Sequence, residues 1–138
     1  MIRKIAVLGA TGSVGKSTLD LLAGREGRFQ VVLLSAHRNG ENLFAQGRRT
    51  GVPHLCWTGL DSPPPQSLGS QTYSPKMHFG AQGLLEALDR SAPDLVLNAI
   101  TGSAGLEASA WTLEQGKDLL LANKESLVVA GPLLRSIA

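Results

Sequence analysis

The chain has 138 residues, which is about the length of one domain. Hydrophobic residues make up 43% of it, charged residues make up 17%, and the formal net charge is +2, a balance that gives no indication of nucleic-acid or membrane binding. No apolar run approaches the length of a membrane-spanning helix, and the single cysteine, Cys56, excludes an internal disulfide. One cysteine also fits a reducing compartment, so we expect a cytoplasmic protein without a signal or transit segment.

The first stretch of the chain, Lys4 to Leu22, predicts a strand, a glycine turn and a helix. The apolar run Ile5 to Leu8 is typical of a buried strand, and Gly9, Gly12 and Gly15 follow it at three-residue spacing. Glycines let a backbone approach a pyrophosphate, and the N–H groups that begin a helix attract anions. The spacing of these glycines differs from both the G-x-G-x-x-G fingerprint and the Walker pattern. The alternative to a nucleotide-binding turn is therefore a tight turn between strand and helix that binds no ligand. The order of strand, turn and helix favours nucleotide binding.

Polar side chains accompany this turn and the next predicted strand. Thr11 and Ser13 are candidate hydroxyl donors, and Ser13 is also a candidate N-cap. The second strand, Phe29 to Ser35, is followed by Ala-His-Arg-Asn, without the carboxylate that usually contacts the ribose of NAD. Arg38 has the charge and geometry to bind a 2′-phosphate instead, which indicates NADP(H). The alternative is an exposed loop arginine without a partner.

The middle of the chain predicts a helix, a short strand and a loop. Asn39 is a plausible N-cap for a helix that runs to about Arg49, with Leu43 and Phe44 facing inward. A third strand is expected over Val52 to Trp57, where His54 and Cys56 are read as half-buried strand residues in preference to a pair of metal ligands. The loop that we expect next, within the same domain, spans Asp61 to Pro75.

Strands and helices then alternate to Ala122. We expect, in order, a helix over Ala81 to Ser91, a strand over Leu95 to Ile100, a turn over Thr101 to Gly105, a helix over Leu106 to Gln115 and a strand over Asp118 to Ala122. The alternation predicts an α/β fold with a doubly wound, Rossmann-like, mostly parallel sheet and helices on both faces. The turns at the strand ends are expected to line one crevice at the carboxyl edge of the sheet. They are Gly9–Gly15, Ser35–Asn39, Thr101–Gly105 and Asn123–Ser126.

Four segments in this order carry a family resemblance: GATGSVGKSTLDLL, SAHRN, AITGSAGLEA and GKDLLLANKESLVVAG. Together they closely resemble the 1-deoxy-D-xylulose 5-phosphate reductoisomerases, and ANKESLV is the most specific of their motifs. The resemblance covers most of the chain and is weakest between Gly51 and Lys76. It implies an NADPH-dependent oxidoreductase and isomerase of non-mevalonate isoprenoid biosynthesis, which forms 2-C-methyl-D-erythritol 4-phosphate and requires Mg²⁺ or Mn²⁺.

The resemblance also implies roles for individual residues. Residues expected to contact NADPH are Thr11, Gly12, Ser13, Val14, His37, Arg38, Asn39, Ala99, Asn123 and Glu125. Lys124 is expected to reach the sugar-phosphate substrate beside the nicotinamide. Family members often carry glycine at the position of His37, so this contact is expected to differ in detail from that of the family. From the residues alone, Asn123 is also a simple N-cap followed by two exposed charged neighbours.

The resemblance further implies that residues 1–138 form the amino-terminal, NADPH-binding domain of a longer homodimeric enzyme. The acidic metal ligands, the catalytic residues and the phosphate pocket of the family come after the ANKES segment. We therefore expect no catalytic residue and no metal ligand in this chain, and no turnover by the chain alone. The alternatives are a different NADP-linked dehydrogenase, against which ANKES argues, and a non-catalytic NADP(H)-binding sensor or module.

Overall fold

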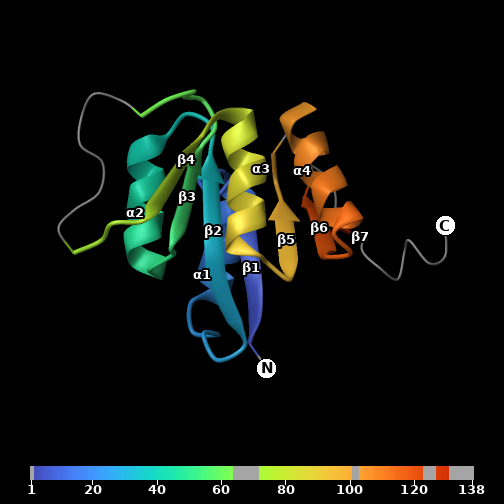
Figure 1. The fold of residues 1–138 in the computed structure, drawn as a ribbon. Helices are drawn as coiled ribbons and strands as arrows, with labels where there is room; N and C mark the ends of the chain where they lie inside the picture. The colour runs from blue at the N-terminus through green and yellow to red at the C-terminus, as the bar shows by residue number, and fades with distance from the viewer. Residues whose placement is uncertain (1, 64–71, 101–102, 123–126, 131–138) are drawn as a thin grey trace.

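The computed structural model describes residues 2–63, 72–100, 103–122 and 127–130, and the strands within them form one seven-stranded sheet. In chain order the strands are β1 (Arg3–Leu8), β2 (Phe29–Ala36), β3 (His54–Trp57), β4 (Lys76–Phe79), β5 (Leu95–Asn98), β6 (Asp118–Ala122) and β7 (Leu127–Ala130). The helices are α1 (Ser13–Leu22), α2 (Gly40–Thr50), α3 (Gly80–Ser91) and α4 (Ser103–Glu114). Figure 1 shows the sheet between its two layers of helices. None of the helices in the described residues is long and apolar enough to cross a membrane.

Strand β1 lies at the centre of the sheet, where the direction of winding reverses. The strand order is β4-β3-β2-β1-β5-β6-β7, so the chain first moves outward through β2, β3 and β4 and then returns to add β5 on the other side of β1. The described pairs are parallel from β4 to β6, and β7 pairs with β6 in the antiparallel direction. This confirms the predicted doubly wound, mostly parallel sheet, with its switch point beside β1.

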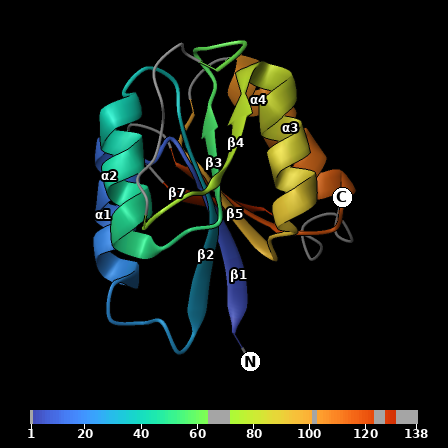
Figure 2. The same ribbon diagram turned by 60° about the vertical axis from the view of Figure 1, so that its left-hand side comes forward.

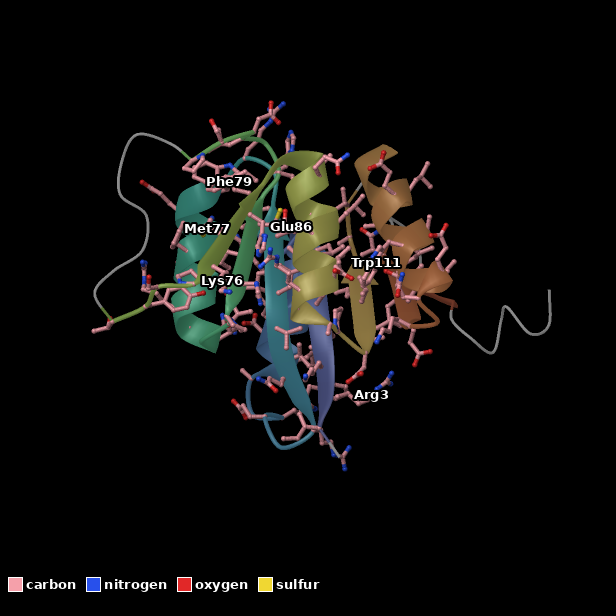
Figure 3. The ribbon with its side chains drawn as sticks, in the orientation of Figure 1. Arg3, Lys76, Met77, Phe79, Glu86 and Trp111 are labelled. Carbon is pink, nitrogen blue, oxygen red and sulfur yellow. The ribbon has the colours of Figure 1, made fainter. Side chains whose placement is uncertain are left out.

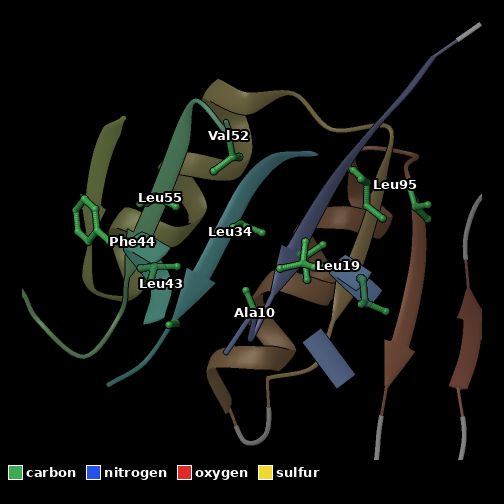
Figure 4. Close-up of a cluster of buried hydrophobic side chains, with 12 residues drawn as sticks. Ala10, Leu19, Leu34, Leu43, Phe44, Val52, Leu55 and Leu95 are labelled. Atoms are coloured by element: carbon green, nitrogen blue, oxygen red, sulfur yellow. The ribbon is translucent and has the colours of Figure 1, made fainter. Parts of the chain in front are cut away.

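Both faces of β1 are buried, because successive side chains of a strand point to opposite faces. Ile5 and Val7 belong to a cluster that contains Leu19 of α1 and Leu43 and Phe44 of α2. Figure 4 shows this cluster in close-up. Figures 1 and 2 show how the two pairs of helices cover the two faces. The inward positions predicted for Leu43 and Phe44 are confirmed.

The opposite face of the sheet carries a second cluster. Ala6 and Leu8 pack there with Leu84 and Leu88 of α3 and with Ala108 of α4. Each of these residues is at most 2% exposed, and Ile5 and Val7 on the other face are also buried, so both surfaces of the central strand are sealed from water. The near-continuous apolar run of β1 is therefore explained by helices on both sides of it.

Two strands were not predicted. Lys76 to Phe79 forms β4 at the edge of the sheet, and residues 58–63 and 72–75, the described part of the connection to β3, contain no helix. Leu127 to Ala130 forms β7 at the opposite edge. The predicted alternation of strands and helices therefore did not include the two edge strands, β4 and β7.

Two predicted helix starts also need correction. Ser13 is the first residue of α1 and Gly12 occupies the N-cap position, with no side chain capping this helix. Helix α4 begins at Ser103, which shortens the predicted turn before it. The predicted cap of α2 is confirmed, because the Asn39 Oδ1 atom accepts a hydrogen bond from the Asn42 N–H at 3.2 Å.

His54 has a partner, but it is not Cys56. The Nδ1 atom of His54 lies 3.1 Å from the Nε2 atom of His78 on the neighbouring strand β4. Cys56 is fully buried, and burial raises the pKa of its thiol to about 12. No group of three or more His, Cys, Asp or Glu side chains in the described part of the chain is placed to hold a metal ion.

The His54–His78 pair predicts that acid destabilises the fold. Burial is the largest cause that lowers the pKa of both imidazoles below the ordinary value of 6.5, and the charges of Lys76 and Arg90 lower them further. Glu86 opposes this for His78. Figure 3 shows Lys76 on β4 and Glu86 on α3. Below pH 6.5 these imidazoles bind protons more readily in the unfolded chain than in the folded chain. The contribution of the pair to the free energy of unfolding is therefore fully present above pH 6.5 and is lost as the pH falls toward the lowered pKa values of the folded state.

Urea unfolding at a series of pH values checks this expectation. We expect the free energy of unfolding to decrease steadily below pH 6.5 in the unmodified chain. The double variant His54→Gln, His78→Gln removes both titrating groups and should show a shallower decrease. An equal slope in the two proteins would show that other groups cause the acid sensitivity.

Candidate nucleotide-binding cleft

A cavity of about 440 Å³ opens at the carboxyl edge of the sheet. Its walls come from the segments that directly follow β1, β2, β3 and β5, so it lies at the switch point of the winding. In open α/β sheets this is the place where ligands bind. The lining residues are Gly9, Thr11, Gly12, Ser35, Ala36, His37, Arg38, Asn39, Thr58, Ala99 and Ile100.

The glycine turn is tied to the end of β2. Gly9 has a φ of 80°, a left-handed conformation that glycine adopts without strain. Its N–H donates to the Ser35 carbonyl oxygen at 3.1 Å and lies 3.2 Å from the Ser35 Oγ atom. The Ala10 N–H donates to the same carbonyl oxygen at 2.8 Å. Two strands thus hold the turn in one position at the floor of the cleft.

Gly15 and Gly12 serve different purposes. A Cβ atom at Gly15 would lie 2.3 Å from the Gly9 carbonyl oxygen and 2.7 Å from the Ala10 Cα atom, because α1 packs directly against the turn. A Cβ atom at Gly12 would meet only the Gly9 oxygen, at an ordinary 3.6 Å, and the φ of Gly12 is −77°. Packing therefore requires glycine at position 15. At position 12 packing does not require glycine, but the absence of a side chain there leaves the lining of the cleft open.

The first turn of α1 is suited to an anion. It has no capping side chain and no acidic residue, so its N–H groups remain available for a negatively charged ligand. Ser13 and Val14 lie in this turn and are exposed, although they do not line the cavity itself. Thr11 does line it.

The end of β2 supplies positive charge to the cleft. His37, Arg38 and Asn39 are exposed and line the cavity. Arg38 makes no ion pair with the described residues, and the described lining contains no carboxylate. A guanidinium in such surroundings is available for a phosphate, and the described lining offers no acidic group to bind a ribose hydroxyl.

The wall at β5 is fixed by a buried amide. Asn98 is 1% exposed, and its Nδ2 atom donates to the Gly105 carbonyl oxygen at 2.7 Å and to the Ser109 Oγ atom at 2.8 Å. Its Oδ1 atom accepts from the Ile100 N–H at 3.0 Å. These bonds hold the backbone that carries Ala99 and Ile100 into the lining.

The cleft thus brings together Thr11, Gly12, His37, Arg38, Asn39 and Ala99 from the predicted contacts. Asn123, Lys124 and Glu125 lie outside the described residues. The sequence reasoning missed Ser35 as the anchor of the glycine turn and Thr58 as a lining residue. Thr58 directly follows the predicted third strand. Because ligands bind at the carboxyl ends of parallel strands, this position could have identified Thr58 as a lining residue.

A reversing parallel sheet, a glycine turn before an uncapped helix and a cationic loop at one edge define a Rossmann-like dinucleotide-binding domain. The model of one protein family, 1-deoxy-D-xylulose 5-phosphate reductoisomerase, matches residues 5–131. The chain belongs to the 1-deoxy-D-xylulose 5-phosphate reductoisomerase family. The resemblance seen in the sequence is confirmed, and membership decides against a different family of NADP-linked dehydrogenases.

Curated relatives with this name come from several bacteria. The protein of Symbiobacterium thermophilum is 37% identical over 142 residues, which cover 100% of this chain and 37% of the relative. The protein of Moorella thermoacetica is 42% identical over 136 residues, which cover 97% of this chain and 35% of the relative. The chain therefore spans about a third of the length of the curated relatives that it matches.

Solved structures of the family show the same fold. The reductoisomerase of Zymomonas mobilis in complex with NADPH aligns with a TM-score of 0.76 and 36% identity, over 91% of this chain and 33% of that chain. A reductoisomerase in complex with NADPH, fosmidomycin and magnesium aligns with a TM-score of 0.77 and 30% identity, over 91% of this chain and 31% of that chain.

Proposed function

We propose that this chain is the NADPH-binding domain of an enzyme that isomerises and reduces 1-deoxy-D-xylulose 5-phosphate to 2-C-methyl-D-erythritol 4-phosphate. The observation that carries the proposal is the cleft, where an uncapped helix lies beside an arginine that has no ion-pair partner among the described residues, and where the described lining contains no carboxylate. The related Zymomonas mobilis enzyme, whose fold this chain shares, is in complex with NADPH. The reaction belongs to non-mevalonate isoprenoid biosynthesis.

The proposed binding mode assigns one part of NADPH to each wall. Thr11 and Gly12, with Ser13 and Val14 in the first turn of α1, bind the pyrophosphate and the adjoining ribose through N–H groups and hydroxyls. Ala99 lies along the cofactor beyond the glycine turn. In the redox step the described residues of the cleft hold the cofactor in position, and the hydride comes from NADPH itself.

The adenosine 2′-phosphate is proposed to bind at the end of β2. Arg38 pairs with it through the guanidinium, and His37 and Asn39 flank it. The Asn39 Oδ1 atom is engaged in the cap of α2, which fixes that side chain and leaves its Nδ2 group as the donor.

The substrate end of the site lies outside the described residues. We propose that Asn123 and Glu125 contact NADPH and that Lys124 contacts the sugar phosphate, as the family motif implies. A related reductoisomerase is in complex with magnesium. The described residues of this chain contain no donor set that fits a divalent cation, so we propose that its ligands lie elsewhere in the protein. We also propose that the enzyme is a cytoplasmic homodimer that binds no nucleic acid.

Calorimetric titration of the chain with NADPH and with NADH tests the proposed cofactor. We expect NADPH to bind about tenfold more tightly or better, because the 2′-phosphate adds charge-assisted hydrogen bonds to Arg38. Equal affinities would contradict the 2′-phosphate site, and no binding of either would contradict the cofactor role. A non-catalytic NADP(H) sensor would use the same cleft, and turnover by the whole protein would distinguish the enzyme from it.

A further inference from the structure

We propose that Thr58 is a positioning residue that holds the His37 ring in place for the 2′-phosphate of NADPH. The inference deepens the proposed function and rests on it. Thr58 follows β3 and His37 follows β2, and these two strands are parallel neighbours. Both residues line the cleft beside Arg38. None of the motifs considered in the sequence assigned a role to Thr58.

The two loops are joined by a set of short contacts. The Thr58 N–H donates to the Ala36 carbonyl oxygen at 2.9 Å, and the Thr58 Oγ1 atom lies 3.4 Å from the same oxygen. The Oγ1 atom also lies 3.1 Å from the His37 Nδ1 atom. The next residue, Gly59, is so close that a Cβ atom there would lie 2.0 Å from the His37 carbonyl oxygen. The pairing is therefore part of the packing between the loops.

The two contacts of the Thr58 hydroxyl give the direction that we assign to its hydrogen bond with the histidine ring. A threonine hydroxyl has one proton, and a carbonyl oxygen can only accept. With the Thr58 proton directed to the Ala36 oxygen, the Oγ1 lone pairs are left for His37, so the Nδ1 atom must carry the hydrogen and donate it. In this arrangement the neutral His37 ring carries its hydrogen on Nδ1.

In the neutral Nδ1–H ring the Nε2 atom carries only a lone pair, so it is the protonated ring that can donate to a phosphate. When the ring is protonated, both nitrogens donate, so Nδ1–H keeps its bond to Thr58 while Nε2–H can donate to a phosphate oxygen. A hydrogen bond between charged groups is stronger than a neutral one, and the described lining has no carboxylate to compete for the imidazolium. Thr58 thereby reduces the rotational freedom that the ring would lose on binding.

Replacing the Thr58 hydroxyl tests the proposal. In Thr58→Val, which keeps the shape of the side chain, we expect the Kd for NADPH to rise about threefold to tenfold and the Kd for NADH to stay unchanged. Thr58→Ser keeps the hydroxyl and should restore NADPH affinity. Thr50→Val is the matched control, because the Thr50 hydroxyl donates to the Gln46 carbonyl oxygen within α2, away from the cleft.

A double-mutant cycle with His37→Ala separates positioning from a general effect on the cleft. In the His37→Ala background, Thr58→Val should cause no further loss of NADPH affinity. An undiminished loss there, or an equal loss for NADPH and NADH, would overturn the role of Thr58. Equal binding of NADPH and NADH by the unmodified chain would instead contradict the proposed 2′-phosphate site, and no binding of either would contradict the proposed cofactor role.

Nitrogen NMR of the His37 ring gives a second test that needs no variant. We expect the Nδ1–H tautomer of the neutral ring in the unmodified chain, since the Thr58 hydroxyl accepts from that nitrogen. A ring protonated at Nε2 alone would contradict the proposal even if Thr58→Val fails to fold.

Discussion

The variant Gly15→Ala is expected to lose about 3 kcal/mol of stability, despite gaining a better helix former. Alanine in a helix is normally favoured over glycine by about 1 kcal/mol. Here the added Cβ atom would lie 2.3 Å from the Gly9 carbonyl oxygen and 2.7 Å from the Ala10 Cα atom. Both are backbone atoms of a turn that Ser35 holds in place, so neither can move aside cheaply. The steric cost therefore exceeds the gain in helix propensity.

Gly12→Ala is the matched variant, with the same change three residues earlier. Its Cβ atom would meet the Gly9 oxygen at 3.6 Å, so we expect the free energy of unfolding to change by no more than about 1 kcal/mol. The new methyl group would instead occupy the lining of the cleft, and NADPH affinity should fall. Urea unfolding and calorimetric titration of both variants measure the two effects. A Gly15→Ala protein as stable as the unmodified chain would show that α1 can shift away from the turn.

The variant Arg38→Ala is expected to raise the Kd for NADPH about 10- to 100-fold and to leave the Kd for NADH nearly unchanged. Arg38 makes no ion pair among the described residues, so its removal breaks no internal interaction there. The loss should therefore fall on the 2′-phosphate, the group that distinguishes the two cofactors. Calorimetric titration of the variant with each cofactor gives the ratio directly.

Arg28→Ala is the control for the loss of one positive charge. Arg28 is exposed and directly precedes β2, so it lies at the amino edge of the sheet, opposite the cleft. We expect its cofactor affinities to match those of the unmodified chain, apart from a small long-range effect that salt removes. Equal losses for NADPH and NADH in Arg38→Ala would show that Arg38 acts on the shared part of the cofactors.

The elements that could be predicted from the sequence are those with a strong local pattern of residues. The apolar run of β1 and the Asn39 cap of α2 could be predicted because their signals lie within a few adjacent residues. Strand β4 was missed because it has four residues and lies at the edge of the sheet, where pairing with β3 decides the structure. Serine is a common N-cap residue, so Ser13 was a reasonable candidate. In the structure Gly12 is the N-cap of α1, and Ser13 is the first residue of the helix.

The candidate site was predictable only where one loop contains the whole signal. The glycine turn and the sequence from His37 to Asn39 could be assigned because each occupies a single stretch of chain. The hydrogen bond between His37 and Thr58 joins residues 21 positions apart and exists because β2 and β3 are neighbours in the sheet. His54 and His78 likewise meet through strand pairing. Because His78 is distant in the sequence and Cys56 is close, His54 was first considered together with Cys56.

Cys56 gives the molecule a built-in reporter of its own opening. Thiol reagents react with the thiolate, and burial both covers this sulfur and raises its pKa to about 12, so the closed fold is nearly inert to them. Its side chain lies on the α3 face of the sheet, in the cluster with Leu84 and Leu88. Labelling therefore reports the openings of the fold that expose this cluster, including separation of α3 from the sheet. Cys56 is the only cysteine in the sequence, so this signal comes from a single place.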